Sequence, residues 1–269
     1  MPVKFGGPRR RPCVQVHNPP RPGLPFPEIV GQNRAMFAKS QAFYDAIYSW
    51  KDYPAEVEKI ERVIRARVPH ARTLLDVACG TGKHLELLRE RYEVEGVDLD
   101  PGLLAVARER LPDVPLHEAD MREFDLGRTF DVVTCLFSAI GYARGRKELG
   151  RSIAAMARHV SPRGALVVEP WLGPDVWQEG HVNAVLVDRP GLKIARMNRA
   201  DRDGQMSVME MHYLVGTPGE GVQHFTEHHE MTLFRHDEYV DAFRAAGLNV
   251  DHDPEGLTGR GLYVASSAV

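Results

Sequence analysis

The sequence predicts an α/β fold: a mainly parallel, seven-stranded sheet with helices on both faces and an inserted antiparallel sheet. Two observations lead to this prediction. From about residue 73 to residue 171, short apolar runs alternate with amphipathic segments, which is typical of a parallel sheet covered on both sides. After residue 171 the segments become longer and alternate between polar and apolar residues, as strands with one buried face do.

The change of pattern divides the chain into four expected parts. They are a proline- and arginine-rich extension (residues 1–33), a core (34–171), an antiparallel insertion (172–235) and a C-terminal helix and strands that complete the core (236–269). The prolines of the extension cannot continue a helix or fill a central strand. The extension is therefore either a disordered tail or a subunit interface, and a homo-oligomer is an open alternative.

The elements of the core are expected in order along the chain. Helices are expected at residues 36–48 and 54–67, and the apolar run from Thr73 to Cys79, bounded by Gly80, predicts the first buried strand. A helix through residues 84–88 follows, and Pro101 suits the first turn of a later helix. The remaining core elements are expected at strand 94–99, helix 101–111, a short strand ending at Asp120, strand 130–137, helix 147–160 and strand 164–171.

The insertion is expected to form an antiparallel meander. The turn sequences Asp203-Gly204 and Pro218-Gly219-Glu220-Gly221 separate three alternating segments, at residues 193–200, 207–215 and 224–234. A helix over residues 237–246 then ends at Gly247, and two final strands return the chain to the core.

The composition argues against several classes of partner. The formal net charge is −3, so no overall positive field would recruit a nucleic acid. No apolar stretch is long enough for a transmembrane helix, and Arg9 to Arg11 are not followed by the apolar segment of a secretory signal. The cysteines, Cys13, Cys79 and Cys135, lack the spacing of a metal site. These features predict a cytoplasmic enzyme with reduced thiols, no metal, and neither nucleic acid nor membrane as partner.

The first expected strand and the glycine-containing turn after it include the stretch Leu75 to Gly82. A phosphate-binding loop would need a glycine where Val77 stands and a serine or threonine where His84 stands. A dinucleotide site would need a third glycine where Leu85 stands. Neither class of site accounts for an acid at the strand end, Asp76.

The next two expected strands also end with acids, at Asp98 and Asp120. The carboxyl ends of parallel strands share one crevice, so we expect the three acids to lie together. Asp76 suits the amino group of S-adenosyl-L-methionine, Asp98 the ribose hydroxyls, and Asp120 the adenine amino group, with Met121 packing on the ring. The sequence therefore predicts a Rossmann-like site for this cofactor, formed by Asp76, Ala78, Gly80, Gly82, Asp98, Leu99, Asp120 and Met121.

These motifs resemble those of the class I methyltransferases. Residues 36–266 more closely resemble the bacterial N,N-dimethyltransferases of dTDP-amino sugars, of the desosamine and mycaminose type, in stretches 51–53, 75–82, 116–124, 137–142, 168–171, 232–234 and 259–262. The resemblance implies N-methylation, by N,N-dimethylation, of a dTDP-linked amino deoxysugar in antibiotic or other natural-product biosynthesis. It further implies that Tyr44, Tyr53 and Phe137 line the cofactor pocket and that Arg260 lies near the nucleotide end of the substrate.

Two residues are candidates for binding the substrate, each with a structural alternative. Arg260, between two glycines, could hold a diphosphate through its guanidinium or could be a surface residue of a tight turn. Trp171, after Glu169-Pro170, could stack on a base or sugar or could be buried in the core.

The acceptor end of the site departs from the pattern of this family. The mycaminose-type enzymes carry a histidine at the position of Tyr142, a tyrosine near Met36 and Phe37, and a second tryptophan where Leu172 stands. These departures leave open whether the methylated amine is at C-3′ or C-4′, and whether one or two methyl groups are added.

A methyl acceptor must be a neutral amine, because a protonated amine has no lone pair. Tyr142, His224 and His229 are the candidates for receiving its proton. Along a strand, positions 224 and 229 fall on opposite faces, so at most one is expected at the amine, and a structural or solvated role is the alternative for each. Tyr142 is expected to accept a hydrogen bond rather than to act as a strong base, since its ordinary pKa is near 10.

Other functions are open on the sequence alone. They are an O- or C-methyltransferase of another small metabolite, an amine methyltransferase for glycine-like acceptors, and a non-catalytic module that binds S-adenosylmethionine. The loop over residues 136–140 lacks the Asn/Asp-Pro-Pro-Tyr/Phe motif of DNA amine methyltransferases, which counts against that class.

Overall fold

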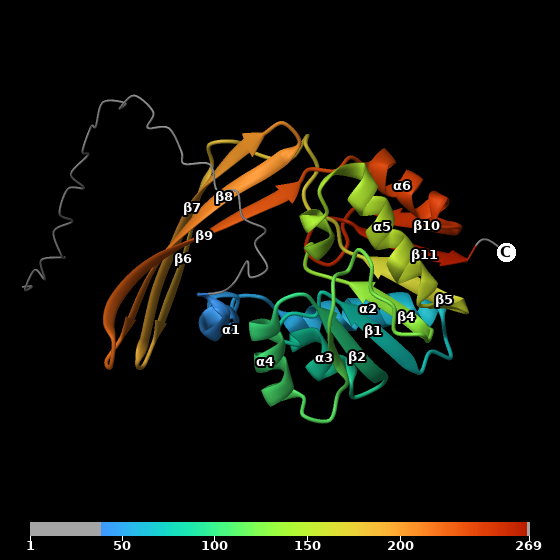
Figure 1. Ribbon diagram of the computed structural model, residues 1–269, viewed down its shortest axis with the longest axis horizontal. Coiled ribbons are helices and arrows are strands. Elements are labelled where there is room, and N and C mark those ends of the chain that lie inside the picture. The colour runs from blue at the N-terminus through green and yellow to red at the C-terminus, as the bar shows by residue number, and fades with distance from the viewer. Residues whose placement is uncertain (1–38, 268–269) are drawn as a thin grey trace, which may run out of the picture. The chain divides into compact units, whose positions relative to one another are not determined.

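The computed structural model describes residues 39–267 of the chain. The predicted extension (1–33), Cys13 and residues 36–38 of the first expected helix lie outside the described residues. The described part forms a seven-stranded sheet and a four-stranded sheet (Figure 1). None of the helices within residues 39–267 is both long and apolar enough to cross a membrane.

The larger sheet consists of β1 (Thr73–Val77), β2 (Glu93–Asp98), β3 (Leu116–Glu118), β4 (Phe130–Cys135), β5 (Val160–Val168), β10 (Leu248–Asp253) and β11 (Leu262–Ser267). Their order across the sheet is β10-β11-β5-β4-β1-β2-β3 (Figure 1). Strands β1 to β5 pair in parallel, whereas β11 is antiparallel to both β5 and β10. This confirms the predicted, mainly parallel sheet. The strand order reverses between β1 and β4, which is where such sheets bind their ligands.

Helices cover both faces of this sheet. They are α2 (Tyr53–Arg67), α3 (Lys83–Leu88), α4 (Pro101–Arg110), α5 (Gly145–Arg158) and α6 (His236–Ala245), with η1 (Gln41–Phe43), α1 (Tyr44–Ile47) and η2 (Ala139–Tyr142) as short turns. Asp52 and Asp100 cap the N-termini of α2 and α4 by accepting backbone N–H groups, and each helix has a proline in its first turn. The local sequence therefore specifies where these two helices begin.

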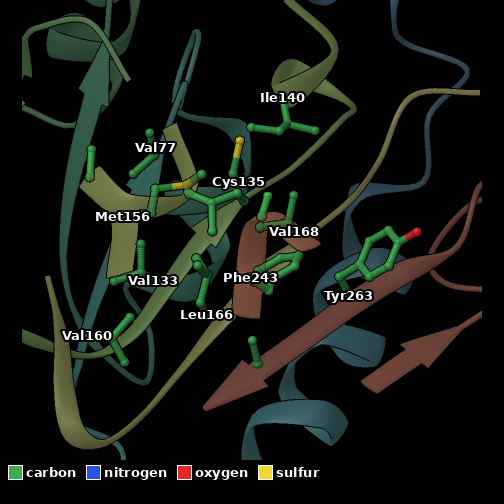
Figure 2. Packing of buried hydrophobic residues seen from close by; sticks show 14 of the residues in the cluster. Val77, Val133, Cys135, Ile140, Met156, Val160, Leu166, Val168, Phe243 and Tyr263 are labelled. Carbon is green, nitrogen blue, oxygen red and sulfur yellow. The ribbon is translucent and has the colours of Figure 1, made fainter. Parts of the chain in front are cut away.

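Alternate residues of the strands form two separate cores. Leu75, Val133 and Leu166 face α5 and α6, whereas the intervening residues of the same strands face α2, α3 and α4. Figure 2 shows the first core, in which Val133 and Leu166 of the sheet lie near Phe243 of α6. Each of these side chains is fully buried, which stabilises the fold by about 1.5–3 kcal/mol per residue.

The smaller sheet is an antiparallel meander of β6 (Val182–Arg189), β7 (Leu192–Asp203), β8 (Met206–Thr217) and β9 (Gly221–Thr232) (Figure 1). The three strands expected from the sequence correspond to β7, β8 and β9, and β6 was not expected. One face, with Ile194, Met209, Met211 and Tyr213, is buried together with Ile47 of α1. We call this face the inner face of the small sheet.

Several elements end earlier than expected. Strands β1 and β4 end at Val77 and Cys135, because Ala78 and Phe137 have φ values of 60° and 50°, which no strand residue adopts. In place of a continuous helix up to residue 48, the described part has only η1 and α1. The backbone N–H of Ser40 donates to the carboxylate of Glu227 (3.0 Å), which ties the start of the described chain to β9.

Candidate cofactor and acceptor site

The turns after β1 and β4 have an unusual backbone. Among the described residues, three that are not glycine have a positive φ: Ala78, Phe137 and Ser138. They lie on the two sides of the point where the strand order reverses. A left-handed conformation costs such residues about 1–2 kcal/mol each, and positions of this kind cluster at functional sites. Two of the predicted cofactor residues, Ala78 and Phe137, belong to this group.

The glycine turn after β1 lies close to helix α4 and to Asp98. A Cβ on Gly82 would lie 2.9 Å from Leu111, whereas a Cβ on Gly80 would meet no atom of the described residues within 4 Å. The N–H of Gly80 donates to Oδ2 of Asp98 (2.7 Å), and the N–H of Asp100 donates to Oδ1 (2.8 Å). Asp98 therefore joins the turn to the end of β2, and Gly80 leaves open space beside it.

Asp76 and Asp98 are buried, and neither forms an ion pair within residues 39–267. Asp76 accepts one hydrogen bond from Thr134 Oγ1 (2.7 Å). Burial raises the pKa of each carboxyl to about 6. Two desolvated acids suit a ligand that brings a positive charge and hydroxyl donors. The amino group and ribose of S-adenosylmethionine supply both, so these residues fit that cofactor.

The adenine end of the predicted site is more open. Leu99 is exposed, and Met121 is half-buried against the first core. Asp120 accepts hydrogen bonds from Arg122 on both oxygens (2.8 and 3.0 Å from Nε), and Arg122 also contacts Glu148. An adenine amino group at Asp120 would therefore share the carboxylate with Arg122.

Aromatic rings gather opposite the strand ends. The ring centroids of Tyr44 and Tyr48 are 4.6 Å apart, and Tyr48 packs edge-on against Phe137 at 5.1 Å. The Lys51 ammonium lies 4.6 Å from the ring centroids of both Tyr53 and Phe137. The predicted residues Tyr44, Tyr53 and Phe137 thus form one contiguous group with Tyr48 and Lys51, which sequence reasoning had not singled out as site residues.

A buried carboxylate, Glu169, connects three loops of the site. It accepts hydrogen bonds from the N–H of Phe137 (2.7 Å) and from Thr258 Oγ1 (2.7 Å). Arg260 donates to Ser138 Oγ (3.1 Å), so the loop before β11 is tied to the turn after β4 at two points. Glu169 thus holds the strained turn at Phe137 in place.

The two predicted substrate residues lie together. The guanidinium of Arg260 is 5.1 Å from the ring centroid of Trp171 and 5.6 Å from that of Phe137. The indole N–H of Trp171 donates to Ser207 Oγ on the small sheet (2.9 Å). Trp171 is half-buried, so it packs against the small sheet while its ring contacts Arg260.

Tyr142 and His229 are brought together from distant parts of the chain. The Tyr142 hydroxyl lies 2.9 Å from Nδ1 of His229, and Nε2 of His229 lies 3.9 Å from the Glu227 carboxylate. His224 is not part of this group: it lies on the outer, exposed face of β9 and stacks on His212. The geometry therefore favours His229 over His224, because strand positions separated by an odd number of residues, here five, point to opposite faces.

Comparison with known proteins identifies the relationship. Residues 74–164 match a family described as "Methyltransferase domain". The chain is 45% identical, over 84% of its length and 96% of the relative, to dTDP-3-amino-3,4,6-trideoxy-alpha-D-glucopyranose N,N-dimethyltransferase from Streptomyces venezuelae. It is 41% identical, over 82% and 90% of the two chains, to dTDP-4-amino-2,3,4,6-tetradeoxy-D-glucose N,N-dimethyltransferase from Saccharopolyspora spinosa.

This chain belongs to the dTDP-amino-sugar N,N-dimethyltransferase family. Its fold also matches the S-adenosylmethionine-bound structure of CalS10, an amino pentose methyltransferase from Micromonospora echinaspora, with a TM-score of 0.77 and 43% identity over 85% and 96% of the two chains. The protein is therefore an S-adenosylmethionine-dependent methyltransferase, and the buried acids at the ends of β1 and β2 are the residues that suit this cofactor.

Helix α1 of the methyltransferase connects the cofactor turn to the small sheet. Asp45 accepts a hydrogen bond from Thr81 Oγ1 (2.8 Å) and forms an ion pair with Arg110 of α4. On the other side of the same helix, Ala46 and Ile47 are buried against the inner face of the small sheet. No sequence motif marked Asp45, although its position one residue after Tyr44 could have suggested a role at the site.

A buried ionic group underlies the aromatic residues of the methyltransferase. Glu56 pairs with Lys51 and lies 2.9 Å from Nε2 of His84. Burial raises the pKa of Glu56, but hydrogen bonds from His84 and Lys51 outweigh it, and the net pKa is lowered. Glu56 is thus an anion that fixes Lys51 beside the rings of Tyr53 and Phe137. The stretch Lys51-Asp52-Tyr53 had been noted only as a point of resemblance.

Proposed function

We propose that this enzyme methylates the amino group of a dTDP-linked amino deoxysugar, giving an N,N-dimethylated sugar for natural-product biosynthesis. The observation that carries the proposal is the contact between the half-buried Tyr142 and the buried His229, since Tyr142 lies in η2, shortly after the strained turn at Phe137. This pair offers a route for the protons that an amine must lose. The names of the relatives, which act on 3-amino and 4-amino sugars, support the substrate class.

S-adenosylmethionine supplies an electrophilic methyl group, so the protein has to align the acceptor nitrogen and remove its protons. The amine uses its lone pair to form the N–C bond as the C–S bond breaks, with the bonding electrons left on sulfur. The product nitrogen then carries one proton too many. In our assignment this proton passes to the oxygen of Tyr142, while the hydroxyl proton of Tyr142 passes to Nδ1 of His229.

The environment of Tyr142 favours such a relay over a free phenolate base. Burial raises the pKa of Tyr142 well above its usual value, so the hydroxyl stays protonated until its own proton moves on. The imidazolium that forms at His229 faces the carboxylate of Glu227. Burial alone would raise the pKa of Glu227, but the neighbouring His229 and the hydrogen bond from Ser40 outweigh it and lower the pKa below its usual value, so Glu227 is an anion at neutral pH.

Dimethylation makes a stronger demand on this relay than a single transfer does. After the first transfer the nitrogen is an ammonium and has no lone pair for a second attack. The relay of Tyr142 and His229 would return it to the neutral form. Arg260 and Trp171 would hold the nucleotide end of the substrate, since a guanidinium binds a diphosphate through paired hydrogen bonds.

The test is incubation of the enzyme and S-adenosylmethionine with dTDP-3-amino and dTDP-4-amino deoxysugars in parallel, followed by mass spectrometry. We expect a gain of two methyl masses on one of the two isomers, which also identifies the carbon that bears the amine. Binding of the cofactor without methylation of either isomer would disprove the substrate class and leave an S-adenosylmethionine-dependent methyltransferase with another acceptor.

A further inference from the structure

Arg196 of β7 is a buried cation without a carboxylate partner in the part of the chain that the structure describes. Its side chain is on the inner face of the small sheet, the residue is 8% exposed, and its Nε has no hydrogen-bond partner there. Its one hydrogen bond is from Nη1 to the hydroxyl of Tyr48 (3.2 Å), and its guanidinium lies 5.3 Å from the Tyr48 ring centroid. A buried charge without a counter-ion is costly to keep, so a stability role does not explain it.

Two more unpaired donors belong to the same face. Asn198, two residues further along β7, is 5% exposed, and its Nδ2 has no partner among the described residues. The indole N–H of Trp177 is likewise buried and unpaired there, and the Trp177 ring packs with the inner-face cluster of the small sheet. Residues i and i+2 of a strand share a face, so Arg196 and Asn198 point the same way.

Glu227 of β9 is a buried acid on the same inner face. Glu227 accepts hydrogen bonds from the N–H groups of Lys39 and Ser40 on Oε1. Its Oε2 lies 3.9 Å from Nε2 of His229 and has no hydrogen-bond partner within residues 39–267. Glu227 forms no ion pair with Arg196 within residues 39–267, where its one ionic neighbour is His229. The unpaired side-chain atoms of Arg196, Asn198 and Trp177 are all hydrogen-bond donors. Arg196 gives this group of three residues one positive charge.

A chain of ring contacts joins this group to Arg260. Arg196 lies over Tyr48, Tyr48 packs against Phe137 (5.1 Å between centroids), and Arg260 lies 5.6 Å from the Phe137 centroid. On the other side Trp177 packs against Trp171, which also contacts Arg260. The two arginines thus stand at opposite ends of one aromatic group, one on the small sheet and the other on the loop before β11.

We propose that Arg196, Asn198 and the Trp177 indole form a second anion-binding subsite, which takes the diphosphate of the nucleotide-linked acceptor together with Arg260. The inference rests on the proposed function for the identity of the acceptor. A diphosphate offers only acceptors and two or more negative charges, which matches a donor-only group with a cation at each end.

The test compares the binding of dTDP and of thymidine by calorimetry, each with saturating S-adenosylmethionine. Arg196→Met keeps the volume of the side chain and removes the charge. We expect it to weaken dTDP binding by about 10- to 100-fold, the range for loss of a charge-assisted hydrogen bond, and to leave thymidine binding unchanged. Arg199→Met is the matched control, because Arg199 lies on the outer face of the same strand with its side chain 63% exposed.

Stability gives a second readout. Replacement of a buried, unpaired cation by methionine should leave the melting temperature equal or higher, whereas a structural role for Arg196 predicts a lower one. Asn198→Leu removes a donor without changing charge, and we expect a smaller loss of dTDP affinity.

The outcomes separate this inference from the proposed function. Unchanged dTDP binding by both Arg196→Met and Asn198→Leu would overturn the subsite, even if the wild-type enzyme methylates a dTDP-amino sugar. An equal loss of thymidine binding would mean that these residues contact the nucleoside rather than the diphosphate, which would also overturn the proposed subsite. If the wild-type enzyme binds no dTDP and methylates neither amino sugar, the proposed function fails, and the subsite fails with it.

Discussion

The ionised form of Asp76 destabilises the free protein but favours binding of the positively charged cofactor. The pKa of Asp76 is raised by burial to about 6, above the ordinary value of 3.8. A raised pKa of an acid means that the folded state favours the protonated form. The contribution of Asp76 to stability is therefore fully present below about pH 4 and is lost as the pH rises through about 6. The positive amino group of the cofactor would remove this penalty.

We predict that Asp76→Asn stabilises the free enzyme at pH 7.5 by on the order of 1–3 kcal/mol, and that the difference from wild type vanishes near pH 4. The same variant should lose most of its affinity for S-adenosylmethionine. Urea unfolding across the pH range checks the first part, and calorimetric titration with the cofactor checks the second. A variant that is less stable at pH 7.5 and binds the cofactor normally would contradict both. Wild-type affinity for the cofactor should itself fall below about pH 6, where Asp76 becomes protonated.

Two of the three histidines of β9, His224 and His229, provide a matched pair of variants. We predict that His229→Asn lowers the turnover number by about 100-fold, within the range of 10²–10⁴ for a general base, and that the monomethylated product accumulates. His224→Asn, on the exposed outer face, should leave both rate and product unchanged. Mass spectrometry of the product over time measures the ratio of one to two methyl groups. Equal slowing of both transfers without accumulation of the monomethyl sugar would argue against the relay.

Which residues of the site could be predicted from the sequence depends on how local their signal is. Asp76 and Asp98 each lie at the carboxyl end of a recognisable strand, so the strand pattern alone places them at one edge of the sheet. Glu227 and Arg196 carry no such signal, because they lie on alternating strands whose docking against the core is set by tertiary contacts. For His224 and His229 the two-residue period indicated opposite faces, but only the structure shows that His229 faces Tyr142.

At the scale of the elements, the strands with regular apolar runs could be recognised in the sequence, whereas the edge strand β6 could not. Its sequence, from Val182 to Arg189, places apolar residues at consecutive positions, and most of them are exposed, so neither strand nor helix periodicity shows. Its partner β7 alternates between buried and exposed residues over most of its length and was predicted, although its ends extend beyond the expected range. Edge strands are specified by pairing to their neighbour more than by their own pattern.

Helix α1 is short, so its position depends on tertiary contacts rather than on its own propensity. Asp45 is the residue that holds it to the cofactor turn, through Thr81 and Arg110. We predict that Asp45→Ala raises the KM for S-adenosylmethionine by about 10-fold, as expected for loss of a hydrogen bond to a charged group, with a smaller change in kcat. Initial-rate kinetics measure this, and Asp113→Ala, at an exposed position, is the control. An unchanged KM would mean that α1 does not contribute to the cofactor site.

At the scale of the described molecule, the small sheet and the core share a hydrophobic cluster. Its members come from β6 to β9, from α1, and from the segment that carries Trp171 and Trp177. The small sheet is also joined to the core through hydrogen bonds from Trp171 to Ser207 and between Tyr142 and His229. The inner face of the small sheet would be exposed if the sheet detached, so separate unfolding of the two parts is disfavoured.

We therefore predict a single unfolding transition for the small sheet and the core. Tryptophan fluorescence reports on Trp50, which is exposed, and on Trp171 and Trp177 at the junction. Far-ultraviolet circular dichroism reports on the secondary structure of the whole protein, and the two melting curves should coincide. S-adenosylmethionine at 100 times its Kd should raise both midpoints together, by about 5–10 °C, because it adds about 2.7 kcal/mol to the stability of one cooperative unit. If fluorescence melted first and did not respond to the cofactor, the small sheet would be an independent unit. The relay from Tyr142 to His229 would then depend on a docking step that the acceptor itself must induce.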